Sequence, residues 1–158
     1  MSKKINLLET GNMLLAAQKI VLCCHVSPDG DTLGSALGLA RLLEQKGKEV
    51  TVFVDDDINK SLNFIPGIEK VQRPEAGVIV EADLFVVVDA SSFDRVGICN
   101  EVVKAPVLLN IDHHISNTEF ADYLYLDAEA AAAGEIMCDL FEAMGWEYDE
   151  AIAIDFYT

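Results

Sequence analysis

The segment Ile20–His25 (IVLCCH) is followed directly by Val26–Asp31 (VSPDGD). The first part is short, apolar and rich in branched side chains, which predicts a β-strand covered on both faces. The second part turns at a proline and places two carboxylates around a glycine, which permits a tight backbone. A buried strand that leads into a histidine and two aspartates indicates a β-sheet with a binding site at the end of this strand.

Four more segments carry strand patterns, and helical patterns lie between them. Helices are indicated where apolar residues recur every three or four positions and a glycine follows, as at Gly47 and Gly145. Strands that alternate with helices predict an α/β fold, a doubly wound parallel sheet with helices on both faces. The expected strands are Ile20–His25, Val50–Val54, Leu84–Asp89, Val107–Asp112 and a short Leu124–Leu126; the expected helices are Leu7–Gln18, Leu33–Leu43, Ile136–Met144 and a last one from near Asp149.

The size and composition fit one folded domain. The chain has 158 residues, 51% of them hydrophobic, and a mean hydropathy of +0.25, which suits a core and argues against disorder. No apolar run reaches the roughly 18 residues of a membrane helix, and Met1–Asn6 lacks the features of a signal peptide. The four cysteines form no C-x-x-C pair, which favours reduced thiols over structural zinc. We therefore expect one domain, residues 1–158, in the cytoplasm and without a membrane partner.

The net charge of −16, from 27 acidic and 11 basic residues, narrows the choice of partners. Such a surface repels a long polyphosphate backbone, so we expect no long duplex DNA or RNA on this domain alone. Acidity that merely aids solubility is the simpler explanation of this charge. A small anionic substrate remains compatible with it if metal ions reverse the local potential.

Chemically active residues stand at the ends of three of the four strong strand patterns. The first strand ends in His25, the third in Asp89, and the fourth in Asp112, His113 and His114. Ligands of open parallel sheets bind at the carboxyl ends of the strands, so these residues are expected to meet. Asp89 alone could be an ordinary turn residue, but the combination indicates a functional site.

Asp29 and Asp31 would repel each other if both point to one spot, and divalent cations would remove that conflict. The alternative is a turn with a helix N-cap, because Asp31 or Thr32 precedes the helical pattern. Mixed carboxylate and imidazole ligands suit Mn, Fe, Co or Zn better than calcium. His113 and His114 are neighbours in an extended segment, where side chains face opposite ways, so we expect them to have different roles.

Three motifs together resemble the DHH phosphoesterase superfamily. They are HVSPDGDTLGSA at His25–Ala36, VVVDASSFDRVG at Val86–Gly97 and NIDHHISN at Asn110–Asn117, in the family's order and across most of the chain. The glycine in PDGD, the DHHISN run and the alanine-rich helix start at Glu129–Glu135 resemble the oligoribonuclease and pAp-phosphatase (NrnA-like) branch more than family II inorganic pyrophosphatases.

The resemblance implies a pair of divalent metal ions, and Mn2+ is the usual ion of the family. Two ions that share a carboxylate can activate a water molecule between them. The carboxylate shared by both would be Asp89. The implied ligands are His25, Asp29 and Asp89 for one ion, and Asp31, Asp89 and His113 for the other.

The catalytic roles that the resemblance implies fall on His114 and Asp112. His114 would contact the substrate phosphate and could protonate the leaving oxygen, while Asp112 would orient its neighbours. Arg95 is a further candidate for phosphate binding, although it follows Asp94 in a polar loop and a surface salt bridge is the competing explanation.

Two departures from the family pattern limit the resemblance. The fourth motif, with an aspartate for the second ion, is not found before the chain stops at Ala153–Thr158, and Asp155 is not expected to replace that ligand. The DHH-associated domain that binds substrate is also missing from the sequence. We therefore expect a catalytic domain that is incomplete at its C-terminus, folds on its own, is weakly active or inactive alone and can form a homodimer.

The expected function is two-metal-dependent hydrolysis of phosphate esters in short oligoribonucleotides or 3',5'-bisphosphonucleotides. An inorganic pyrophosphatase and a cyclic-dinucleotide phosphodiesterase are the alternatives among enzymes. A nucleotide-binding regulatory module without catalysis is the alternative from another class, although every metal position of the first three motifs is filled. In each case the expected partner is a small phosphorylated molecule.

Overall fold

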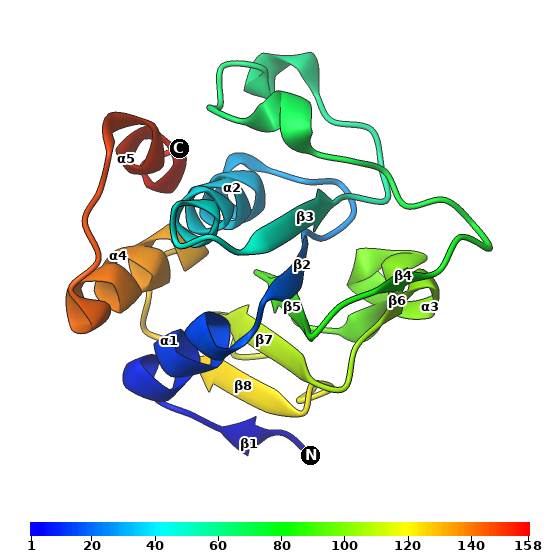
Figure 1. Cartoon of the computed structure of the whole chain (residues 1–158), viewed down its shortest axis with the longest axis horizontal. Helices are drawn as coiled ribbons and strands as arrows, with labels where there is room; N and C mark the ends of the chain where they lie inside the picture. The colour runs from blue at the N-terminus through cyan, green and yellow to red at the C-terminus, as the bar shows by residue number, and fades with distance from the viewer.

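The computed structural model describes residues 1–158 and confirms an α/β fold around a parallel sheet. Six strands lie in the order β1-β8-β7-β5-β2-β3, and every neighbouring pair is parallel (Figure 1). All five expected strands are present, and a two-residue strand at the N-terminus adds one edge. The strands are β1 Lys3–Lys4, β2 Lys19–Cys23, β3 Glu49–Phe53, β5 Leu84–Val88, β7 Leu108–Asp112 and β8 Tyr123–Leu126.

The chain changes its direction of travel across the sheet between β2 and β5. From β2 it passes through helix α2 (Gly30–Gln45) to β3 at one edge, whereas from β5 it moves through β7 and β8 toward the other edge. Such a switch opens a crevice at the carboxyl ends of the two strands. Since Cys23 lies opposite Val87 in the sheet, the segments that follow β2 and β5 emerge side by side.

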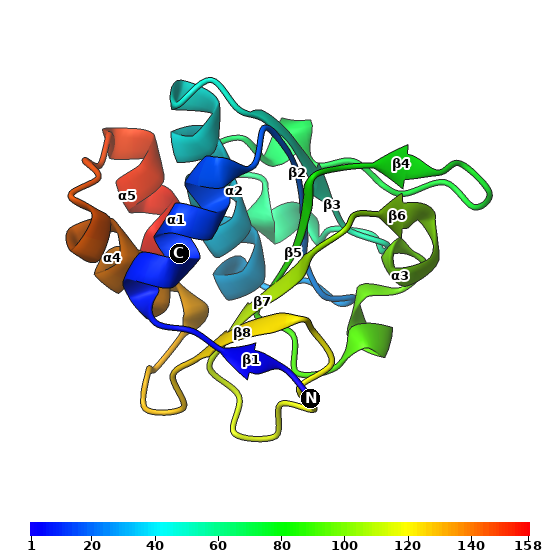
Figure 2. The same ribbon diagram turned by 60° about the horizontal axis from the view of Figure 1, so that its bottom comes forward.

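The two faces of the sheet are covered by different kinds of element (Figures 1 and 2). Alternate strand residues such as Leu22 and Val86 face a large core, while their neighbours Val21 and Val87 face a smaller one. Helices on both faces are thus confirmed, but the helix on the smaller core has only four residues. The large core is covered by α1 Leu7–Ala16, α2, α4 Ala133–Met144 and α5 Glu150–Phe156; the smaller one by the 3-10 helix η3 Phe93–Val96, α3 Cys99–Val102 and the paired strands β4 Val80–Glu81 and β6 Val103–Lys104.

Two short 3-10 helices, η1 Lys60–Leu62 and η2 Ile68–Lys70, lie in the long connection between β3 and β4. None of the helices combines the length and the hydropathy required to cross a lipid bilayer.

Helix α2 begins earlier than its hydrophobic pattern indicates. The pattern starts at Leu33 and suggests Asp31 or Thr32 as the cap, but the helix starts at Gly30. Its N-cap is Asp29, whose Oδ1 accepts a hydrogen bond from the backbone N–H of Thr32 at 2.9 Å. The carboxylate reaches a free amide of the first turn and so fixes the start of the helix. Asp31 consequently lies inside the first turn.

Helices α2 and α5 approach each other through glycines. A side chain at Gly34 would collide with the backbone carbonyl of Asp155, and one at Gly38 would collide with the ring of Phe156. Only glycine allows this approach, so these positions set the distance between the two helices. The last helix of the chain is thereby held against the helix that follows the HVSPDGD segment.

Candidate functional site

The site residues expected from the sequence meet at the carboxyl edge of the sheet. Seven of them line a cavity of about 460 Å³, together with Ala90, Ser91 and Ser116. Asp112 is fully buried and reaches the cavity through its hydrogen bond with His114. The seven that line the cavity are His25, Asp29, Asp31, Asp89, Arg95, His113 and His114.

Asp89 lies at the centre of the site and is only 3% exposed. Its Oδ2 is 3.6 Å from Nε2 of His25, and its Oδ1 is 3.1 Å from Nε2 of His113. The contact with His113 lacks hydrogen-bond geometry, so Oδ1 is buried without a donor. The backbone φ of Asp89 is +63°, a left-handed conformation that costs energy in a residue with a side chain. A strained residue with an unpartnered, buried oxygen between imidazole nitrogens suits a cation site.

Asp89 is shared by two groups of three potential metal ligands. In each group the ligand atoms lie within 4.8 Å of one another. One group is His25, Asp29 and Asp89, the same residues that the family resemblance implies for one ion. The other is Asp89, His113 and His114, so it contains His114 where the resemblance implies Asp31.

Asp31 faces the cavity while its carboxylate is also bound to helix α4. Its Oδ2 is 3.8 Å from Nε2 of His113. The backbone N–H groups of Ala133 and Gly134 donate to its two oxygens, each at 2.9 Å. Asp31 thus occupies the N-terminus of α4, where free amides and the helix dipole favour a carboxylate. Each oxygen keeps a further lone pair, so Asp31 is available as a ligand that the helix holds in place.

His114 forms its hydrogen bond with Asp112 and not with the carboxylates that line the cavity. Its Nδ1 lies 2.6 Å from Oδ1 of Asp112. An ionised carboxylate only accepts, so Nδ1 donates and cannot bind a metal ion at the same time. The 3.9 Å separation between this nitrogen and Asp89 therefore does not make His114 a ligand through Nδ1, and Nε2 remains free.

The expectation that His113 and His114 face opposite ways is wrong. Their ring centroids are 4.4 Å apart, and both rings line the cavity. Strand β7 ends at Asp112, so the two histidines lie beyond the extended segment in which side chains alternate. Their contacts nevertheless differ, because His113 approaches Asp31 and Asp89 while His114 binds Asp112.

The ring of His25 presents Nε2 to the cavity because its other nitrogen is engaged. Nδ1 lies 2.7 Å from the backbone carbonyl of Val26, which only accepts, so Nδ1 carries the proton. Burial would lower the pKa of His25, but the contact with Asp89, the hydrogen bond to the Val26 carbonyl and the charge of Asp29 outweigh it and raise the pKa. Burial raises the pKa of Asp89, with His25 opposing and Asp31 adding to the rise. Both shifts show that this cluster of carboxylates favours added positive charge.

Arg95 lies on the wall of the cavity. Its Nη2 is 3.5 Å from Nδ1 of His25, and no ion pair joins it to Asp94. The surface salt bridge that competes with a role in binding is therefore not present. The backbone carbonyl of Arg95 accepts a hydrogen bond from the N–H of Val26 at 2.7 Å, which ties η3 to the end of β2.

Sequence reasoning missed several residues that support the site. Asp56 accepts a hydrogen bond from the backbone N–H of Ser27 at 2.7 Å and so supports a residue with a φ of +52°. Asn117 donates to Asp112 and to Asn110, and Asn110 donates to backbone carbonyls on either side of Asp89. Asn110 could have been noticed, because it is a single polar residue inside an apolar strand pattern.

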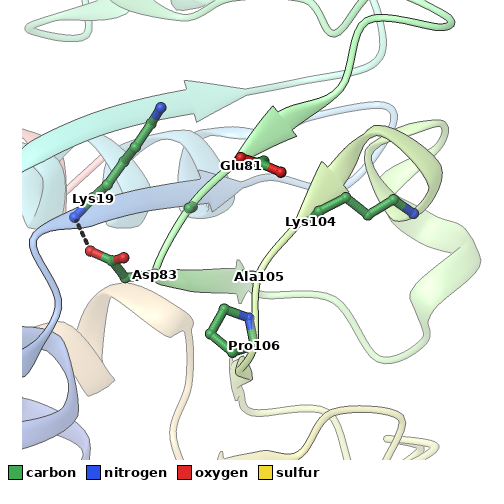
Figure 3. A pocket seen from close by; sticks show the side chains of 7 residues that line it. Lys19, Glu81, Asp83, Lys104, Ala105 and Pro106 are labelled. Atoms are coloured by element: carbon green, nitrogen blue, oxygen red, sulfur yellow. Dashed lines mark hydrogen bonds between the residues drawn. The ribbon is translucent and has the colours of Figure 1, made fainter.

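A larger hollow of about 560 Å³ lies at the opposite, amino edge of the sheet (Figure 3). Lys19, Glu81 and Lys104 line it, and Asp83 accepts hydrogen bonds from the backbone N–H groups of Gln18 and Lys19. Asp83 therefore joins two connections, and no histidine or unpartnered buried oxygen faces this hollow. The size of a hollow does not identify the functional site in this protein.

A family comparison agrees with the geometry at the carboxyl edge. The model of the DHH family, N-terminal domain, matches residues 19–156. The chain belongs to the DHH family. The match includes every residue that lines the cavity.

Curated relatives of this DHH chain include several phosphate-processing enzymes. A bifunctional oligoribonuclease and PAP phosphatase NrnA from Thermus thermophilus is 34% identical over 142 residues, covering 88% of this chain and 41% of the relative. The protein of the same name from Bacillus subtilis is 27% identical over 137 residues, covering 85% and 42%. The cyclic-di-AMP phosphodiesterase PdeA of Listeria monocytogenes is 26% identical over 144 residues, covering 82% and 22%. The DHH chain spans half or less of the length of these relatives.

Solved structures show the same fold. An exopolyphosphatase-related protein from Bacteroides fragilis superimposes with a TM-score of 0.87 at 28% identity, covering 96% of the DHH chain and 48% of that protein. A putative family II inorganic pyrophosphatase from Methanococcus jannaschii gives a TM-score of 0.58 at 21% identity, over 87% and 45% of the two chains. The second likeness shows a shared fold and nothing about substrate.

Proposed function

We propose that this DHH-family chain is the catalytic domain of a two-metal phosphoesterase for short oligoribonucleotides or 3',5'-bisphosphonucleotides. The observation that carries the proposal is the shared carboxylate of Asp89. It belongs to both groups of potential ligands, and its buried Oδ1 has no hydrogen-bond donor. A carboxylate placed between two sets of ligand atoms is what a bridged pair of divalent ions requires. The names of the NrnA relatives support this substrate class.

The side chains fit a pair of divalent ions. His25, Asp29 and Asp89 would hold one, and Asp31, Asp89 and His113 would hold the other. Three carboxylates with two imidazoles form a ligand set that suits Mn2+. Two such ions, when bound, supply Lewis acidity that activates water and neutralises phosphate charge.

The residues of the chain supply orientation and proton transfer around that centre. His25 is fixed in orientation by the Val26 carbonyl, so its Nε2 stays directed at the cavity. His114 keeps its Nδ1–H on Asp112, so Nε2 is the nitrogen that would first take up a proton, giving an imidazolium beside the Asp112 carboxylate, and then pass that proton to the leaving oxygen of the substrate. The guanidinium of Arg95 on the cavity wall matches the geometry of phosphate oxygens.

A panel of substrates tests the proposal. The chain with Mn2+ would be incubated with a short oligoribonucleotide, adenosine 3',5'-bisphosphate, a cyclic dinucleotide and pyrophosphate, and the products would be quantified by chromatography. We expect the first two to be hydrolysed fastest, and both activities to be lost with EDTA and in Asp89→Ala. Hydrolysis of pyrophosphate alone, or of the cyclic dinucleotide alone, would support the corresponding alternative enzyme. Nucleotide binding without hydrolysis of any substrate would favour a regulatory module.

A further inference from the structure

The buried side-chain amide of Asn110 forms hydrogen bonds with the backbone on both sides of Asp89. Asn110 is fully buried in β7, and its Nδ2 donates to the carbonyl oxygens of Val87 at 3.0 Å and Ala90 at 3.2 Å. These two carbonyls flank Asp89, the residue with the left-handed φ of +63°. A strained conformation persists only where the surrounding structure holds it. Asn110 is one of the contacts that hold it.

A second amide extends this contact to the candidate acid. Nδ2 of Asn117 donates to Oδ1 of Asn110 at 2.7 Å and to Oδ2 of Asp112 at 2.8 Å. Oδ1 of Asp112 in turn accepts from Nδ1 of His114 at 2.6 Å. The oxygen of Asn117 is used as well, because it accepts from the backbone N–H of Glu119 at 2.8 Å. The side chains thus form one continuous hydrogen-bonded chain in which both N–H groups and the oxygen of Asn117 are engaged.

The direction of every bond in this chain is fixed by chemistry. Backbone carbonyls only accept, so the nitrogen of Asn110 must face Val87 and Ala90, and its oxygen must face Asn117. An ionised carboxylate also only accepts, so the nitrogen of Asn117 must face Asp112. Neither amide can be turned round without placing two acceptors or two donors against each other. Both oxygens of Asp112 are then occupied by donors, and one of those donors is Nδ1 of His114.

We propose that Asn117, supported by Asn110, is a positioning residue that sets which ring nitrogen of His114 carries the proton. It holds the carboxylate of Asp112 in one orientation, so Nδ1 of His114 is protonated and Nε2 is directed at the substrate phosphate. Asp112 and Asn110 are fully buried, so water has little access to the acceptor atoms of these hydrogen bonds. The kinetic part of this inference rests on the proposed function, whereas the position of the proton does not.

The position of the proton can be read directly in the metal-free chain. Long-range 1H–15N correlation NMR distinguishes a protonated ring nitrogen from a bare one, and with three histidines in the sequence the signals can be assigned by substitution. We expect a proton on Nδ1 of His114 in the wild type. In Asp112→Asn the new oxygen must accept from Asn117, so the new NH2 group faces His114 and moves the ring proton to Nε2. This variant keeps the shape of the side chain.

The double variant separates positioning from packing. When Asn117→Ala is combined with Asp112→Asn, the introduced amide is free to turn, and we expect the proton of His114 to return to Nδ1. If Asn117 contributed to packing alone, its loss would add to the damage, and the double variant would be less stable and less active than Asp112→Asn. The proposal is overturned if Asp112→Asn leaves the proton on Nδ1, or if the single and double variants show the same tautomer. If Asp112→Asn does not fold, Asn117→Ala alone must speed the exchange of the Nδ1 proton of His114 with water, because the carboxylate of Asp112 is then free to turn, and an unchanged exchange rate there also overturns the proposal.

Turnover of a substrate from the panel gives an independent measure. We expect Asp112→Asn to lower kcat by about 10²–10⁴-fold with little change in KM, as for other wrong-tautomer variants, and the double variant to recover about tenfold. Asn59→Ala is the matched control, because the Asn59 side chain only accepts from the N–H of Ser61 at 2.9 Å on the surface. If the wild type hydrolyses nothing, the proposed function fails while the NMR result still decides the positioning role. A double variant with no recovery of kcat contradicts the proposal.

Discussion

Two aspartates, Asp89 and Asp155, are both buried, but different residues surround them. Asp89 is 3% and Asp155 1% exposed, and burial raises the pKa of both carboxyl groups. Asp89 has one buried oxygen without a hydrogen-bond donor, and Asp155 has two. Removing a carboxylate from water without such donors costs free energy in either place.

The difference lies in what converges on each carboxylate. Asp89 follows β5 at the sheet edge, where nitrogens of His25 and His113 lie within 3.6 Å of its oxygens. Asp155 lies in α5 against α2, and the charges that act on it are those of Arg41 and Asp149. An unpartnered buried carboxylate therefore indicates a ligand site only where other ligand atoms meet it.

Metal affinity provides the sharpest test of this contrast. Asp89→Ala should abolish Mn2+ binding, with an affinity loss of about 10²-fold or more, because the residue belongs to both groups of ligand atoms. Asp155→Asn should leave the affinity within about twofold of the wild type, because no other ligand faces it. Isothermal calorimetry with Mn2+ on the two variants measures both. Equal losses would remove the distinction between the two aspartates.

A second variant separates metal binding from proton transfer within the Asp89 site. His114→Ala should retain Mn2+ affinity, because Nδ1 of His114 is bonded to Asp112 and does not act as a ligand. It should lower kcat by about 10²–10⁴-fold, the range for a lost acid–base group. Calorimetry and steady-state kinetics on the same preparation provide the comparison. A loss of Mn2+ binding as large as that of Asp89→Ala would instead make His114 a ligand.

The strands could be predicted because their residues satisfy local and global requirements together. Leu84–Val88 is apolar at every position, which suits a strand that is buried on both faces. Strand β1 carries no such pattern, because Lys3 and Lys4 are polar and form a strand through their pairing with β8. The start of α2 was misplaced for a similar reason, since a cap is set by a hydrogen bond and not by hydrophobic periodicity.

The site could be predicted as a set of residue types but not as a network. Parallel strands bring His25 and Asp89 to one edge of the sheet regardless of side-chain conformation, so the rule for parallel sheets was enough to predict that they meet. The bond between Asp31 and the backbone of Ala133 joins residues 102 positions apart, which no local pattern indicates. The position of Asn117 also depends on a loop contact, in which the next residue, Thr118, donates its backbone N–H to the carbonyl of Ser91.

A smaller effect is expected for Arg95, which we propose to bind the substrate phosphate. Arg95→Ala should raise KM by about tenfold with a small effect on kcat, because it removes one charged donor from the cavity wall. Arg73→Ala is the matched control, since Arg73 pairs with Asp55 and Asp57 outside the cavity. Steady-state kinetics with a short oligoribonucleotide measures both variants. The same KM for Arg95→Ala and the wild type would remove Arg95 from the binding residues.

The smallest effect concerns stability at Asp155, where no function is expected. Burial raises the pKa of Asp155 from 3.8 to about 7, with Arg41 opposing the rise and Asp149 adding to it. The folded protein then binds more protons than the unfolded chain between these two pH values, so its free energy of unfolding falls as the pH rises through that range. Asp155→Asn has no proton to lose, so the fall should be smaller in this variant. The variant should therefore be the more stable protein at pH 8, with a melting temperature a few degrees above the wild type.

Thermal unfolding of both proteins from pH 4 to pH 8 measures this difference, and the comparison cancels the general effect of the acidic surface. Asp94→Asn is the control, because Asp94 lies exposed on η3 and its side chain keeps access to water. Parallel stability curves for the wild type and Asp155→Asn would show that Asp155 is already ionised without cost. Arg41 would then be the cation that compensates the charge of Asp155. Asp155 would in that case be a buried carboxylate stabilised by positive charge, as Asp89 is expected to be.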